Sequence, residues 1–112
     1  MDLDIRENGN ICVLKLKGPL KLGDGVEQLD SAVASTLEGG HIFLVLDLEA
    51  MPYIDSSGIG AIVSALRRAK QLGGEAKLVN PSSFAAKTLK MVGILNLFNV
   101  YPTEASAVEA CG

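Results

Sequence analysis

The longest uninterrupted apolar run in the chain is only five residues long, from Ile42 to Leu46. A membrane-spanning helix needs about 18 or more consecutive apolar residues, so this run does not predict one. In an extended chain, the residues that point to either face of this segment are apolar until Asp47. A short segment of this kind is typical of a central strand that is covered on both faces. Residues 42–48 are therefore predicted to form a buried strand.

Two further strands are predicted before this one. Residues 11–17 alternate between apolar and polar toward their end, as in a strand with one wet face. A weaker strand is predicted from Leu3 to Arg6. Asn8-Gly9 lies between the two and is a strong hairpin-turn pair.

A helix is predicted between residues 17 and 42. Asp24 is expected as its N-cap, with Glu27 three residues later. The apolar residues that follow recur at spacings of three or four, which favours an amphipathic helix: Val26, Leu29, Val33 and Leu37. Gly39-Gly40 is expected to end the helix.

The remainder of the chain continues to alternate between helices and strands. We expect a second helix ending at Leu72, a strand over 76–79, a third helix capped by residues 80–83 and ending at Gly93, a short strand near 99–101 and a small helix after Pro102-Thr103. Strands that alternate with helices predict an α/β fold with a mainly parallel sheet.

Composition and charge argue against several classes of function. Ten Lys and Arg against thirteen Asp and Glu give a formal net charge of −3, which does not favour binding to nucleic acid. Arg67, Arg68 and Lys70 are interpreted as a solvated helix face. The chain has no CxxC pair or cluster of His and Cys, so no metal or other cofactor is predicted. Residues 1–4 lack the features of a signal peptide, so we expect a cytoplasmic protein without membrane insertion.

Three kinds of catalytic site do not fit the sequence. A nucleophile elbow needs a glycine two residues before its serine, and neither Ser56 nor Ser57 has one. The single histidine, His41, precedes the buried strand, so we expect it at the opposite end of the sheet. Residues 58–63 carry only the first two glycines of a dinucleotide-binding loop. The acidic residues nearby are interpreted as a solvated rim: Asp47, Glu49 and Asp55. The chain is predicted not to be an enzyme.

Residues 51–60 join the carboxyl end of the buried strand to the next helix, where ligands and partners dock in open α/β sheets. A phosphoryl group on a serine at the start of this helix would carry about −1.5 to −2 charges and would meet the positive end of the helix dipole. The fold would accept this charge, whereas a partner surface on the same spot would have to desolvate it. Spacing alone also fits Ser56 and Ser57 as simple N-caps, or a site for a small anionic ligand.

Residues 53–60, Tyr-Ile-Asp-Ser-Ser-Gly-Ile-Gly, with the buried strand before them and the helix that ends at Gly73-Gly74, resemble the anti-sigma factor antagonists of the STAS-domain family. The resemblance covers nearly the whole chain. It implies one small STAS-like domain over residues 1–112, with a central, mostly parallel sheet of four to five strands and helices packed mainly on one side. It further implies binding to an anti-sigma factor that is also a serine kinase using ATP, with release of the sigma factor. Phosphorylation of Ser56 would break that complex, and a phosphatase would reset it.

The residues expected to contact this partner lie around Ser56 and in the segment that leads into the first predicted helix. They are Lys21, Asp24, Met51, Tyr53, Asp55, Ser57, Gly58 and Ile59. The family often has a Gly-x-Leu-Asp pattern, but here residues 18–21 read Gly-Pro-Leu-Lys, with Asp24 three residues further on. This departure leaves an alternative function, a non-switching STAS interaction module in a larger signalling or lipid-transport assembly. No oligomeric state is predicted.

Overall fold

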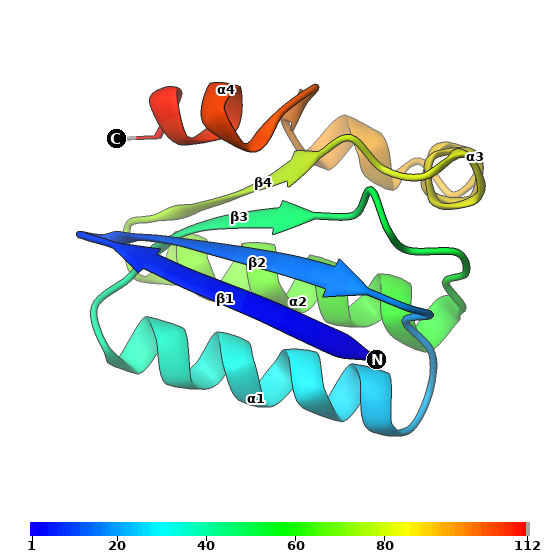
Figure 1. Ribbon diagram of the computed structural model, residues 1–112, viewed down its shortest axis with the longest axis horizontal. Helices are drawn as coiled ribbons and strands as arrows, with labels where there is room; N and C mark the ends of the chain where they lie inside the picture. Colours follow the sequence, from blue (N-terminus) through cyan, green and yellow to red (C-terminus); the bar gives the residue numbers. More distant parts are fainter. Residues whose placement is uncertain (112) are drawn as a thin grey trace.

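Five strands form one sheet in the computed structural model, which describes residues 1–111 (Figure 1). The strand order is β1-β2-β3-β4-β5. β1 is antiparallel to β2, and every other neighbouring pair is parallel. The elements are β1 (Asp2–Asn8), β2 (Ile11–Lys17), α1 (Asp24–Glu38), β3 (Phe43–Asp47), α2 (Ser56–Gln71), β4 (Glu75–Val79), α3 (Ser83–Met91), the 3₁₀ helix η1 (Ile94–Leu97), β5 (Val100–Tyr101) and α4 (Glu104–Glu109). The predicted mostly parallel α/β sheet is confirmed.

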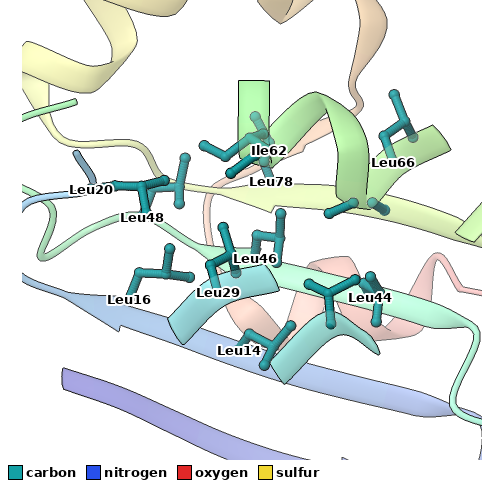
Figure 2. Packing of buried hydrophobic residues seen from close by; sticks show 14 of the residues in the cluster. Leu14, Leu16, Leu20, Leu29, Leu44, Leu46, Leu48, Ile62, Leu66 and Leu78 are labelled. Carbon is teal, nitrogen blue, oxygen red and sulfur yellow. The ribbon is translucent and has the colours of Figure 1, made fainter. Parts of the chain in front are cut away.

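The main core lies between the sheet and the helices α1 and α2 (Figure 2). Leu14 of β2 and Leu46 of β3 are fully buried there, and so are Leu29 of α1 and Ile62 of α2. Cys12 lies in the same core with no exposed surface, because it faces the same side of β2 as Leu14.

A smaller cluster covers the opposite face of the sheet. Ala107 of α4 packs there against Val13, Val45 and Val79. β3 is therefore covered on both faces, which confirms the prediction from its uninterrupted apolar run. Since α1 and α2 both lie on the larger face and only the six-residue α4 lies on the other, the helices are packed mainly on one side.

The start of α1 corrects one prediction. Gly23, not Asp24, is the N-cap residue, and no side chain caps this helix. The dihedrals of Gly23 are φ 108° and ψ −138°, in a region that L-amino acids with side chains rarely adopt. Asp24 is already helical, so its carboxylate belongs to the first turn. There its negative charge interacts favourably with the positive end of the helix dipole. Near the N-terminus of the chain, the predicted hairpin is present with Gly9-Asn10 as its loop, one residue later than expected.

The helix α2 positions the segment of greatest interest at its N-terminal end. Its buried residues all face the main core: Gly58, Ala61, Ile62, Ala65, Leu66 and Ala69. At 16 residues it is the longest helix in the described part of the chain. None of the helices within residues 1–111 is both long and apolar enough to cross a membrane.

Candidate functional site at the start of helix α2

The loop between β3 and α2 lies against the segment that leads from β2 into α1. The amide of Leu20 donates to the carbonyl of Tyr53 over 2.9 Å, and the amide of Asp55 donates to the carbonyl of Leu20 over 3.2 Å. Leu20 and Ile54 thus form a parallel bridge that lies outside the named strands. Gly58 permits this contact, because a Cβ there would lie 2.3 Å from the Leu20 carbonyl oxygen. The two loops are therefore fixed together at the start of α2.

Asp55 holds both loops with a single carboxylate. Its Oδ1 accepts a 2.9 Å hydrogen bond from the amide of Gly58 and so caps α2. Its Oδ2 accepts a 3.0 Å hydrogen bond from the amide of Leu22, in the loop before α1. The amides of Gly58 and Leu22 stabilise the charged form, and they lower the pKa of Asp55 below its usual range. The charged carboxylate is therefore the form that shapes the loop.

Ser56 is the first residue of α2, and it is exposed. Ser57 follows it and is half-buried. The N-cap of α2 is Asp55, so the interpretation of the two serines as N-caps is wrong. With the capping position already taken, the Ser56 side chain lies at the surface, at the positive end of a 16-residue helix.

Three exposed apolar side chains lie on the segments around Ser56; we call Leu22, Tyr53 and Phe84 the apolar rim. Leu22 is 76% exposed, Tyr53 44% and Phe84 45%. The rings of Tyr53 and Phe84 are stacked at a tilt, with centroids 5.3 Å apart. Ser82, the N-cap of α3, fixes Phe84 near the loop because its hydroxyl donates to the carbonyl of Met51.

The sequence pattern does not single out Leu22 or Phe84 as site residues. Phe84 fits the apolar spacing of the third helix, and Leu22 belongs to no periodic pattern. Their proximity to the site depends on contacts between segments far apart in the sequence. A sequence signal that would have found Phe84 is the serine pair before it, because a Ser N-cap places the first helical residues at a loop end.

The remaining predicted contact residues differ in accessibility. Lys21 and Asp24 are exposed, and Ile59 is half-buried against the main core. Met51 is among the predicted partner contacts, but its side chain is fully buried. The turn in which the amide of Met51 donates to the carbonyl of Leu48 belongs to a loop that packs back onto the core, so Met51 is not a partner contact.

Gly58 also requires a correction as a contact residue. It is buried beneath the Leu20 segment, so it serves packing and does not offer a surface to a partner. Gly60, the other glycine of the motif, is exposed, and a Cβ added there would meet no atom within 4 Å outside its own helix and chain neighbours. Of these two glycines, only Gly58 is required by a close backbone approach.

Two residues considered for catalysis lie away from Ser56. His41 contacts the carbonyl of Gly9 and the carboxylate of Glu7 beside the β1–β2 hairpin, at the far end of β3 as predicted. Asp47 is not part of a solvated rim, since it is only 3% exposed. Burial, together with a hydrogen bond with Glu104 of α4, raises its pKa to about 6. Within residues 1–111, no three His, Cys, Asp or Glu residues are grouped so that they could hold a metal ion.

A known family model matches nearly the whole of this fold. Residues 2–107 match the family model of the STAS domain. The chain belongs to the STAS domain family. This STAS domain is 28% identical over 98 residues to the anti-sigma F factor antagonist of Lysinibacillus sphaericus, covering 87% of this chain and 82% of the relative.

Solved STAS structures share the fold. An anti-sigma-factor antagonist (STAS) domain protein from Planctomyces limnophilus superposes with a TM-score of 0.82 at 22% identity, over 98% of this chain and 97% of that one. The phosphorylated form of SpoIIAA, a Bacillus cell fate determinant, superposes with a TM-score of 0.78 at 23% identity, over 96% and 97%. At these identities the similarity concerns the fold.

Proposed function

We propose that this STAS domain is an anti-sigma factor antagonist. It binds an anti-sigma factor that is also a serine kinase, releases the sigma factor, and loses its partner when Ser56 is phosphorylated. The observation that carries the proposal is the exposed Ser56 side chain at the first position of α2, beside the apolar rim. The name of the Lysinibacillus relative and the existence of a phosphorylated SpoIIAA with this fold support it. In this role the domain acts in the cytoplasm, as a substrate and not as an enzyme.

The docking surface consists of the apolar rim together with the exposed residues Lys21 and Asp24. Apolar side chains at the centre of an interface and charged ones at its margin are the usual arrangement in transient complexes. Because Asp55 fixes Leu22 relative to α2, the rim and Ser56 are presented to the partner as one surface. A partner that covers the rim brings Ser56 into its interface.

The switching step is a phosphoryl transfer. The Ser56 hydroxyl oxygen attacks the γ-phosphorus of ATP bound to the kinase, the bond from that phosphorus to the ADP oxygen breaks, and the hydroxyl proton passes to a base of the kinase. The phosphoserine carries about −1.5 to −2 charges at pH 7. Hydrolysis by a phosphatase breaks the new bond with water, releases phosphate and restores the hydroxyl.

The new charge affects the fold and the complex differently. Within the domain, it lies at the N-terminus of α2, where the helix dipole is favourable to an anion. In the complex, the same charge would have to be desolvated beside the apolar rim, which is unfavourable without a new cationic partner. Phosphorylation therefore weakens binding more than it weakens folding.

Incubation with the cognate kinase and ATP tests the proposal by mass spectrometry of the intact chain and its peptides. We expect a gain of about 80 Da, one phosphoryl group, on Ser56. Ser56→Ala should take up no label, while the matched variant Ser57→Ala should be labelled like the wild type. Label on Ser57 alone would contradict the assignment of the site.

A second function is favoured by one residue. Lys21 stands where the family often has an acidic residue, and it is exposed beside Leu22 at the proposed docking surface. A changed charge at this position suits a different partner, in a STAS module that docks without being phosphorylated. Partner binding without label in the same kinase experiment would favour this function over the switch.

A further inference from the structure

Charge is divided unevenly between one edge of the molecule and the rest. The strand β1 and the helix α1 together contain seven acidic residues and a single basic residue, Arg6. The rest of the chain contains six acidic and nine basic residues. On β1 this excess is offset in part, because Asp2 and Asp4 lie directly across from Lys17 and Lys15 of β2, whereas α1 contains four acidic residues and no basic one. Such a surface attracts cationic partners over a distance of about a Debye length, roughly 8–10 Å.

A groove of about 450 Å³ lies between β1 and α1 on this acidic side. Leu3, Ile5 and Ala32 supply its apolar lining, and Asp24 and Glu27 its acidic residues. Ile5 is 43% exposed, which is unusual for a residue that pairs in register with the fully buried Leu14. The α1 helix therefore leaves an apolar part of the sheet uncovered at β1.

The groove runs beside a free strand edge. β1 is the terminal strand of the sheet, paired over its seven residues with β2 on one side only (Figure 1). A terminal strand presents unpaired backbone N–H and C=O groups along its outer edge, which can pair with another chain. Backbone pairing, an apolar groove and acidic side chains thus occur together.

We propose that the β1–α1 groove binds an extended basic segment of a partner protein, which adds to the free edge of β1 as a sixth strand. Strand addition directs alternate side chains of the added segment to opposite faces of the sheet. Those on the groove face are apolar where they meet Leu3 and Ile5, and Lys or Arg where they meet Asp24 and Glu27 of α1. This surface shares Asp24 with the docking surface proposed around Ser56, so variants at other positions test the two separately.

A second copy of this chain is a poorer occupant than a basic segment. Antiparallel pairing of two β1 edges would bring Asp2, Asp4 and Glu7 of both copies into one interface. Like charges across paired strands are destabilising. The charge of the edge thus selects a cationic partner and opposes self-association through β1.

Titration of the full-length ¹⁵N-labelled protein tests the proposal by NMR. The probe is a nine-residue peptide in which threonine alternates with leucine in one half and with lysine in the other, so that leucine and lysine share one face. We expect shifts concentrated in β1 and along the groove side of α1. Glu27→Lys should weaken binding about tenfold, because it reverses one groove charge. Glu38→Lys, the same change on the same helix but outside this groove, should weaken it much less. Equal losses in the two variants would overturn the proposed location.

Two altered peptides test the mode of binding. The same peptide with glutamate in place of lysine should not bind, and the peptide N-methylated at every residue should bind far more weakly, because neither of its edges can donate to β1. Undiminished binding of the methylated peptide would overturn strand addition. Shifts centred on Ser56 instead of β1 would overturn the groove as the site, without bearing on phosphorylation of Ser56.

Discussion

The carbonyl oxygen of Leu20 lies 2.3 Å from the position that a Cβ on Gly58 would occupy. The side chain of Ile54 is also close, at 2.9 Å. Gly58→Ala therefore forces the Leu20 segment away from α2, and we expect it to lower the free energy of unfolding by about 1–3 kcal/mol, as overpacking does. Urea denaturation monitored by circular dichroism measures this change.

Gly60→Ala is the matched control for this prediction. No atom outside its own helix and chain neighbours lies within 4 Å of the added Cβ, and alanine is favoured over glycine within a helix by up to about 1 kcal/mol. Gly60→Ala should therefore be neutral or stabilising. Equal destabilisation by the two variants would show that the Leu20 contact is not what requires glycine at position 58.

Asp55→Ala should loosen two segments at once. It removes the acceptor for the amides of both Gly58 and Leu22, so both amides should exchange hydrogen faster than in the wild type. Asp55→Asn is the control, because asparagine is also a good N-cap and should protect Gly58 better than alanine does. Since the pKa of Asp55 is lowered, wild-type protection of both amides should persist as the pH falls to the ordinary aspartate value of 3.8. Faster exchange at Gly58 but not at Leu22 would contradict the double role.

Asp47 should make the protein less stable as the pH rises. Its pKa is raised by burial to about 6 in the folded protein, against 3.8 for an ordinary aspartate. Its protonated form thus favours folding fully below about pH 3.8, and this contribution is lost as the pH rises through about 6. Relative to Asp47→Asn, the wild type should lose on the order of 2 kcal/mol of unfolding free energy between pH 4 and pH 7.

The pKa of Glu104 is also shifted, so the stabilities of the wild type and Asp47→Asn must be compared at each pH. The pKa of Glu104 is lowered by its hydrogen bond with Asp47 and by the neighbouring Arg6, so its contribution has the opposite sign and is lost as the pH falls. Urea denaturation of the wild type and Asp47→Asn at several pH values separates the two effects. Parallel stability curves would show that Asp47 keeps the same protonation state in the folded and unfolded protein.

Ser56→Asp should weaken binding of the anti-sigma factor at least tenfold, or about 1.4 kcal/mol, because it places a charge in the proposed interface. Its melting temperature should remain close to that of the wild type, since Asp at the first turn of α2 suits the helix dipole. Calorimetric titration and thermal denaturation provide the two measurements. A large drop in melting temperature would instead assign Ser56 a structural role.

Leu22→Ala should weaken partner binding by about tenfold with little change in stability, because Leu22 belongs to the apolar rim and is 76% exposed. Met91→Ala is its matched control, since Met91 is equally exposed but lies at the end of α3. Similar binding losses in both variants, measured by the same titration, would place the interface elsewhere.

Much of the fold could be predicted because it depends on local patterns. The apolar run at Ile42–Leu46 predicts a strand covered on both faces, and paired glycines mark the ends of α1 and α2. Two of the wrong predictions, at Asp47 and Met51, depend on contacts between distant segments. Asp47 is buried because α4 brings Glu104 to it, and Met51 is buried because its loop packs back onto the core.

The candidate site was also predictable where it depends on local sequence and not where it depends on contacts between distant segments. The position of Ser56 at the start of a helix follows from the local sequence, whereas the stacking of Tyr53 on Phe84 requires α3 to approach the β3–α2 loop. Gly23 replaces Asp24 as N-cap because backbone dihedrals, not residue preference alone, decide where a helix begins. Residue patterns therefore locate the proposed phosphoacceptor, and the tertiary structure supplies the surface around it.

One carboxylate that bonds two chain segments has a thermodynamic consequence for recognition. With Leu22 and the first turn of α2 already held by Asp55, an incoming protein has little backbone left to immobilise when it docks. Less of its contact energy is consumed by ordering, so the proposed complex can be selective and still dissociate once a phosphoryl group is added to Ser56.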